Sequence, residues 1–194
     1  MIIIFLNLPK KVMSSFHSLK VSNIERITSK AVVVSFEIPD SLKTEFEFLA
    51  GQYIGLKAQI NGEKVRRSYS ICSAPQSGIL EVGIKEVPKG VFSGYVNKQL
   101  AVGDILEVST PEGRFTLTSE TTDNTLVGIA AGSGITPIMS IIKSVILDQS
   151  NSQFVLLYGN KSPEETLFYE ELLMLEKENP RQLKIHWVFS QTNV

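Results

Sequence analysis

Arg67-Ser68-Tyr69-Ser70 places a cation, an aromatic ring and two hydroxyls one after another where a strand should end. Side chains alternate in an extended chain, so Arg67 and Tyr69 should share one face and the two serines the other. Arg67 can bind a phosphate through two parallel donors, Tyr69 can lie flat on a planar ring, and Ser70 can bond a heteroatom at a ring edge. A flavin nucleotide offers all three features, although a polar edge strand with an incidental arginine would look the same.

A second motif, Lys89-Gly90-Val91-Phe92-Ser93, opens a predicted helix that Pro88 and Gly90 begin. Its apolar residues recur at helical spacing: Val91, Phe92, Tyr95, Val96 and Leu100. The first turn of a helix has unpaired N–H groups and partial positive charge, and glycine lets a ligand come close. With the Ser93 hydroxyl and the Lys89 charge, the motif suits a pyrophosphate, although an ordinary glycine before a surface helix would suit it too.

A third motif follows the apolar run from Leu126 to Ala131, which lacks alternation and predicts a strand buried on both faces. The run ends in Gly132-Ser133-Gly134-Ile135-Thr136-Pro137, with Thr136 as the expected N-cap and Pro137 at the first helical position. Dinucleotides bind at such glycine turns in open α/β sheets. The turn is neither a complete G-x-G-x-x-G nor a Walker A motif, and Ala131 rules out a nucleophile elbow.

In this order, the three motifs resemble the ferredoxin–NADP reductase superfamily of flavoprotein reductases. The other matching stretches are Pro111-Glu112-Gly113-Arg114-Phe115, Tyr158-Gly159-Asn160 and Phe168-Tyr169-Glu170-Glu171-Leu172. The resemblance runs from about Phe16 to the C-terminus. Within the superfamily, the run from Arg66 to Pro75 is most similar to the reductase components of bacterial oxygenases.

The resemblance implies FAD and a nicotinamide nucleotide, NADH or NADPH, as ligands. Arg67 would bind a flavin phosphate, Tyr69 would stack on the isoalloxazine, and Ser70 would lie near the reactive nitrogen N5. The residues implied to bind FAD are Arg67, Ser68, Tyr69, Ser70, Lys89, Gly90, Val91, Phe92 and Ser93. Those implied to bind the nicotinamide nucleotide are Gly132, Ser133, Gly134, Thr136, Pro137 and Ser190. The implied catalytic residues are Ser70, Tyr69 and Thr136, the last positioning the electron donor.

The implied reaction passes electrons from NAD(P)H through FAD to an iron–sulfur centre or to a protein acceptor such as an oxygenase. Gln191 stands where NADP-preferring relatives often carry an arginine, which favours NADH or loose selectivity. The alternative function is a flavin-binding electron-transfer or regulatory module without NAD(P)H turnover. A flavin-free hydrolase finds no support, because the chain lacks an elbow serine and a nearby acid–histidine pair.

Composition narrows the functional classes further. The net charge is −1 over 194 residues, so no basic patch predicts nucleic acid or an anionic membrane as a partner. One cysteine, Cys72, supports neither a disulfide framework nor a metal site, and a 2Fe–2S cluster would need a further C-terminal domain. The apolar start from Met1 to Leu8 is too short to span a bilayer, and its basic residues follow it, unlike a secretory signal. The sequence therefore predicts a cytoplasmic protein.

The predicted organisation is β followed by α/β. Residues 1–15 form an N-terminal arm, 16–118 a six-stranded antiparallel FAD-binding barrel, 119–125 a linker, and 126–194 a partial doubly wound parallel-sheet NAD(P)-binding domain with helices on both faces. Asn61-Gly62 predicts a hairpin, and residues 163–178 a helix that Ser162 caps. Because only three parallel strands are predicted and the family's later Cys-Gly-Pro segment has no counterpart, we expect the sequence to be the front part of a longer protein.

Overall fold

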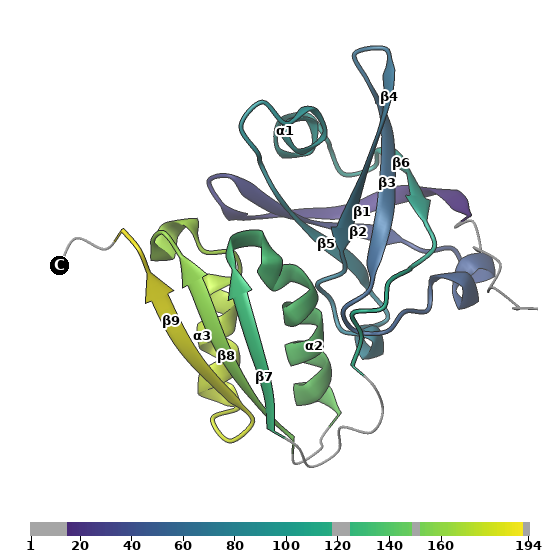
Figure 1. Cartoon of the computed structure of the whole chain (residues 1–194). Coiled ribbons are helices and arrows are strands. Elements are labelled where there is room, and N and C mark those ends of the chain that lie inside the picture. The colour runs from purple at the N-terminus through teal and green to yellow at the C-terminus, as the bar shows by residue number, and fades with distance from the viewer. Residues whose placement is uncertain (1–14, 118–124, 149–151, 192–194) are drawn as a thin grey trace, which may run out of the picture.

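The computed structural model describes residues 15–117, 125–148 and 152–191, and it shows a barrel beside an α/β layer (Figure 1). The barrel contains β1 (Phe16–Thr28), β2 (Ala31–Glu37), β3 (Tyr53–Ile60), β4 (Glu63–Ser70), β5 (Leu80–Lys85), α1 (Val91–Lys98) and β6 (Ile105–Ser109). The second layer contains β7 (Thr125–Ala131), α2 (Ile135–Leu147), β8 (Gln153–Asn160), α3 (Tyr169–Glu178) and β9 (Leu183–Phe189). Most of the predicted arm and linker lies outside the described residues.

The six barrel strands form one antiparallel sheet, which confirms the predicted six-stranded antiparallel architecture, and their order is β4-β3-β6-β1-β2-β5. The sheet curls because its two edge strands meet: Ile71 bridges Val82, and the Cys72 N–H donates to the carbonyl of Glu81 at 2.9 Å. The predicted hairpin joins β3 to β4. Asn61 and Gly62 both have positive φ, 51° and 83°, as a tight type I′ turn requires.

The α/β layer is a parallel sheet in the order β7-β8-β9. Both helices pack on one face of it, so the expectation of helices on both faces is wrong for the described residues. Two successive right-handed crossovers that each advance by one strand in the same direction put their helices on the same side. The first strand is correspondingly not buried on both faces, since Val127 is 70% and Ile129 73% exposed.

Two predicted helix starts are also wrong. Helix α3 begins at Tyr169 because Phe168 takes a left-handed conformation, with φ 59°, which interrupts the expected helix from residue 163. Phe168 is only 3% exposed, so burial of its ring stabilises a conformation that is otherwise unfavourable. Thr136 is not an N-cap, because α2 already begins at Ile135 and the Thr136 hydroxyl donates to the carbonyl of Ser133 at 3.1 Å.

Helix α2 fastens the α/β layer to the barrel. The Ser140 hydroxyl donates to the carbonyl of Ser73 at 2.6 Å, and the Ser144 hydroxyl to the side-chain oxygen of Gln76 at 3.0 Å. Ala31 and Cys72 of the barrel pack into the same apolar core as the helix. This contact brings the first turn of α2 against the barrel at the end where the predicted site residues lie. None of the described helices is long and apolar enough to cross a membrane.

Candidate functional site

A groove of about 710 Å³, the barrel groove, lies beside the end of β4, the end of β5 and the start of α1. It is lined by Arg67, Ser68, Tyr69, Ser70, Gly83, Lys85, Glu86, Val87, Pro88, Gly90, Val91, Phe92, Ser93, Ser133 and Thr136. The three sequence motifs, separated by up to about sixty residues of chain, therefore border one cavity. Its volume lies in the range typical of small-molecule sites.

Two adjacent arginines of β4 point to opposite sides of the strand. Arg67 lines the groove, and among the described residues its guanidinium donates to the carbonyl of Arg66, at 2.7 Å. Arg66 turns away, lies 3.7 Å from the carboxylate of Glu112 and stacks over the ring of Phe16 at 4.9 Å. The alternation predicted for this strand holds for the arginines, but the two serines also line the groove, because β4 is an edge strand.

Tyr69 forms an aromatic wall of the barrel groove. Its ring lies 5.9 Å from that of Phe92, at an angle of 37°, so helix α1 fixes its orientation. Burial raises the pKa of the Tyr69 hydroxyl to about 12, and the nearby positive charge of Arg67 opposes this only in part. The phenol is therefore neutral at physiological pH and can donate a hydrogen bond.

The titration of Tyr69 provides a test of this environment. We expect the flavin-free protein to contain a phenol that titrates at about 12 instead of 10.0, and the Tyr69→Phe variant to lack it in an ultraviolet absorbance titration. Because the folded pKa is raised, the stabilising contribution is complete below pH 10.0 and is lost as the pH rises towards about 12. If the variant instead lacked a phenol that titrates at the ordinary value of 10.0, Tyr69 would not be buried.

The start of helix α1 forms the second wall. Gly90 is its N-cap residue, and a Cβ there would lie 2.5 Å from the Ser93 hydroxyl oxygen and 3.0 Å from the carbonyl oxygen of Val87. The glycine is thus required for close packing of the loop. The Ser93 hydroxyl accepts the N–H of Val87 at 3.1 Å, so it organises this loop in addition to lining the groove.

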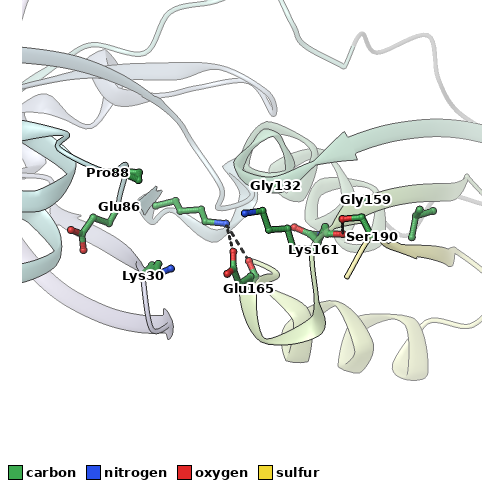
Figure 2. Close-up of a pocket in the computed structure, with 11 residues that line it drawn as sticks. Lys30, Glu86, Pro88, Gly132, Gly159, Lys161, Glu165 and Ser190 are labelled. Atoms are coloured by element: carbon green, nitrogen blue, oxygen red, sulfur yellow. Dashed lines mark hydrogen bonds and ion pairs between the residues drawn. The ribbon is translucent and has the colours of Figure 1, made fainter. Parts of the chain in front are cut away.

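A second groove, of about 640 Å³, lies between the barrel and the carboxyl ends of β7, β8 and β9 and is called the interdomain groove (Figure 2). It is lined by Lys30, Lys85, Glu86, Pro88, Gly132, Gly159, Asn160, Lys161, Glu165, Val188 and Ser190. The two grooves share Lys85, Glu86 and Pro88, so they adjoin. A single extended ligand, or two ligands end to end, could occupy both.

The charges around the interdomain groove favour an anionic ligand. Lys30, Lys85 and Lys161 face two carboxylates, and one of these, Glu86, is already paired with Lys98 at 2.6 Å. The ammonium of Lys85 lies 3.4 Å from the carbonyl oxygen of Glu165 and 3.9 Å from its carboxylate (Figure 2). This distant ion pair leaves Lys85 able to bind a phosphate at the junction of the grooves.

The structure brings most of the predicted site residues together, in two groups. The four residues of β4, the α1 start, Ser133 and Thr136 border the barrel groove, whereas Gly132 and Ser190 border the interdomain groove. Three predicted residues line neither groove in the described part of the chain: Lys89, Gly134 and Pro137. Lys89 takes a left-handed conformation with φ 62°, and Pro137 lies within α2.

Sequence reasoning missed several lining residues. They include Gly83, Lys85, Glu86 and Lys161. Gly83 did carry a signal, because a glycine inside a strand often marks a close approach of another segment. A Cβ at Gly83 would lie 2.9 Å from the methyl of Thr136 and 3.1 Å from the ring of Phe168. Lys85 and Lys161 carried no such signal in the sequence, because a charged residue at a strand end is usually solvated.

Metal or thiol chemistry has no visible basis in the described residues. No group of His, Cys, Asp and Glu side chains there is arranged to hold a metal ion. Cys72 is completely buried, and burial raises the pKa of its thiol, which disfavours the reactive thiolate.

The donor set of the barrel groove fits FAD. Arg67 supplies a guanidinium for a phosphate, and the first turn of α1 supplies unpaired backbone N–H groups for another. Tyr69 supplies a planar surface for a ring system, and Ser70 a hydroxyl beside it. The residues of β4 and of the start of α1 that line the groove carry no acidic side chain, and Glu86, which also lines it, is paired with Lys98 at 2.6 Å.

Comparison with known proteins agrees with this geometry. Residues 18–117 match the model of the oxidoreductase FAD-binding domain, and residues 129–193 that of the oxidoreductase NAD-binding domain. The chain thus contains an oxidoreductase FAD-binding domain followed by an oxidoreductase NAD-binding domain. The chain belongs to the ferredoxin–NADP reductase family, as the sequence motifs predicted.

Two curated relatives are informative. The chain is 37% identical to one component of the 1,2-phenylacetyl-CoA epoxidase of Escherichia coli, over 92% of this chain and 51% of that protein. It is 35% identical to the ferredoxin reductase component of 3-ketosteroid-9-alpha-monooxygenase from Rhodococcus rhodochrous, over 89% of this chain and 49% of that protein. The chain therefore spans about half the length of these relatives.

Among solved structures, ferredoxin-NADP+ reductase from Plasmodium falciparum has a similar fold. Its TM-score is 0.79 at 22% identity, covering 93% of this chain and 76% of that one. At this identity the likeness supports the architecture of barrel and parallel sheet alone.

Proposed function

We propose that the protein takes electrons from NADH or NADPH and passes them, through FAD bound in the barrel groove, to a protein acceptor. The observation that carries the proposal is the junction of the two grooves. Lys85, Glu86 and Pro88 line both, and the glycine turn at residues 132–134 stands beside them. A nicotinamide nucleotide in the interdomain groove would thereby reach the flavin site.

FAD held in the barrel groove would supply the redox chemistry that links a two-electron nicotinamide donor to one-electron acceptors. The protein binds and orients the ligands around this chemistry. Arg67 and the start of α1 hold the phosphates of FAD, Tyr69 covers one face of its ring system, and Ser70 donates a hydrogen bond at the ring edge. These roles rest on the chemistry of the side chains that line the barrel groove.

On the nucleotide side, Thr136 orients the nicotinamide end while Lys85 and Lys161 neutralise the pyrophosphate. Thr136 is suited to this role because it lines the barrel groove directly after the glycine turn, with its hydroxyl held at 3.1 Å from the carbonyl of Ser133. Ser190 lines the far part of the interdomain groove, and Gln191 follows it without a positive charge. We therefore favour NADH over NADPH.

The acceptor we propose is an oxygenase component or an iron–sulfur protein. Support comes from the relatives, one named as part of an epoxidase and the other as the ferredoxin reductase component of a monooxygenase. By analogy with the first of these relatives, a role in the degradation of phenylacetate belongs to the same proposal. A cytoplasmic location stays a prediction from the sequence.

Anaerobic reduction tests the proposal. The protein is saturated with FAD, freed of excess flavin and mixed with NADH in the absence of oxygen. We expect the yellow absorbance of the bound flavin to bleach at a rate that saturates with NADH. A yellow protein that NADH leaves unchanged would favour a flavin-binding module without NAD(P)H turnover, and a protein that takes up no FAD would contradict the proposal altogether.

A further inference from the structure

Tyr158, in the carboxyl half of β8, contacts the glycine turn that follows the neighbouring strand β7. Its side chain is completely buried, and its hydroxyl donates to the carbonyl of Gly132 at 2.8 Å. The same hydroxyl oxygen lies 3.4 Å from the carbonyl oxygen of Leu167. One hydroxyl thus lies between two segments that are far apart in sequence.

Both segments border the candidate nucleotide site. The first is the glycine turn, in which Gly132 has a left-handed φ of 51° and leads to Ser133 and Thr136 on the groove wall. The second precedes α3 and carries Glu165, the partner of Lys85. A glycine turn has several accessible conformations, so a buried donor to its carbonyl restricts it to one.

We infer that Tyr158 is a positioning residue for the nicotinamide nucleotide, because its hydroxyl holds the Gly132–Gly134 turn in the conformation that lines both grooves. This inference rests on the proposed function. Tyr158 is wholly buried and would affect the binding of the nucleotide through the turn, without touching the nucleotide itself. The ligand class is a nucleotide with a pyrophosphate, bound by the backbone of the turn.

The ring and the hydroxyl of Tyr158 have separable roles. The ring packs 5.8 Å from that of Trp187 and belongs to the apolar core. Burial raises the pKa of the hydroxyl, so it remains a protonated donor at any working pH. The Tyr158→Phe change keeps the ring and removes only the donor, which makes it a clean test of positioning.

The chain offers a matched control in Tyr169. Its ring also contacts Trp187, at 4.8 Å, but the structure records no hydrogen bond from its hydroxyl to any described residue. Tyr169 lines neither the barrel groove nor the interdomain groove. The Tyr169→Phe variant therefore perturbs the same aromatic cluster without releasing the glycine turn.

The experiment measures NAD+ binding by calorimetry in the FAD-saturated wild type and both variants, together with the NADH dependence of anaerobic flavin reduction. For Tyr158→Phe we expect NAD+ to bind about tenfold more weakly, the loss of one buried hydrogen bond. The NADH concentration for half-maximal rate should rise, while FAD content stays at the wild-type level. Tyr169→Phe should match wild type in every measurement.

Three outcomes overturn the inference. Unchanged NAD+ affinity in a folded, FAD-loaded Tyr158→Phe protein would assign the hydroxyl to stability alone. Equal losses in both variants would point to the aromatic cluster and not to the turn. A wild-type protein that binds FAD but neither NAD+ nor NADH would contradict the proposed function, and this inference with it. The wild-type measurement alone separates that outcome from a failure of the inference about Tyr158.

Discussion

Replacement of Arg67 by glutamine should weaken FAD binding by about thirtyfold, the loss expected for a charge-assisted hydrogen bond to phosphate. Arg67 is suited to this role because its guanidinium lines the barrel groove, and the one hydrogen bond recorded for it goes to the neighbouring carbonyl of Arg66. A glutamine keeps polar contacts but loses both the charge and the paired donors. FAD affinity is measured by equilibrium titration of flavin fluorescence at fixed ionic strength.

Arg66→Gln is the matched control, since the same substitution falls one residue away on the opposite side of β4. Arg66 lies 3.7 Å from Glu112, both side chains are partly exposed, and such surface pairs contribute about 1 kcal/mol or less. We expect its FAD affinity to remain within about threefold of wild type. Similar losses at both positions would mean that general positive charge, and not a specific phosphate contact, attracts the flavin.

Gly83→Val should have the largest effect on electron transfer between the two ligands. The added Cβ would lie 2.9 Å from the methyl of Thr136 and 3.1 Å from the ring of Phe168, so the side chain of Thr136, or the first turn of α2 that carries it, must shift. Misplacing a substrate-binding segment by about 1 Å can slow a reaction about a hundredfold, and overpacking costs about 1–3 kcal/mol. We expect losses of that size in the anaerobic rate of flavin reduction and in the free energy of unfolding.

The control for this variant is Gly94→Ala, within helix α1. A Cβ at Gly94 meets no atom within 4 Å, and alanine favours the helix, so we expect it to raise stability by about 0.5–1 kcal/mol. Urea unfolding and stopped-flow reduction by NADH are measured on both proteins. A Gly83→Val protein with wild-type reduction kinetics would show that the contact between β5 and α2 does not set the geometry of the site.

Local patterns predicted the barrel well, because its strands are delimited by alternation and by turn residues with defined chemistry. Strand β3 ends at Ile60 and β4 begins at Glu63, so Asn61-Gly62 forms the predicted turn between them. The start of α3 could not be read in the same way. It depends on the burial of Phe168 against residues remote in sequence, which overrides the local preference for helix.

The residues of the candidate site likewise fall into those that consecutive sequence predicts and those that only tertiary packing brings into place. Motifs whose chemistry lies in consecutive residues, such as Arg67 to Ser70, could be found from the sequence. Lys85 and Tyr158 could not, because their positions at the groove junction and behind the glycine turn arise only when the barrel and the parallel sheet pack together. The side on which helices cover the sheet likewise follows from strand order, which the sequence does not display.

The most direct test is a crystal structure of the protein with FAD bound. The account predicts that the flavin ring system lies against Tyr69 in the barrel groove, with its phosphates between Arg67 and the first turn of α1. FAD bound elsewhere, or bound without contact to these groups, would contradict it.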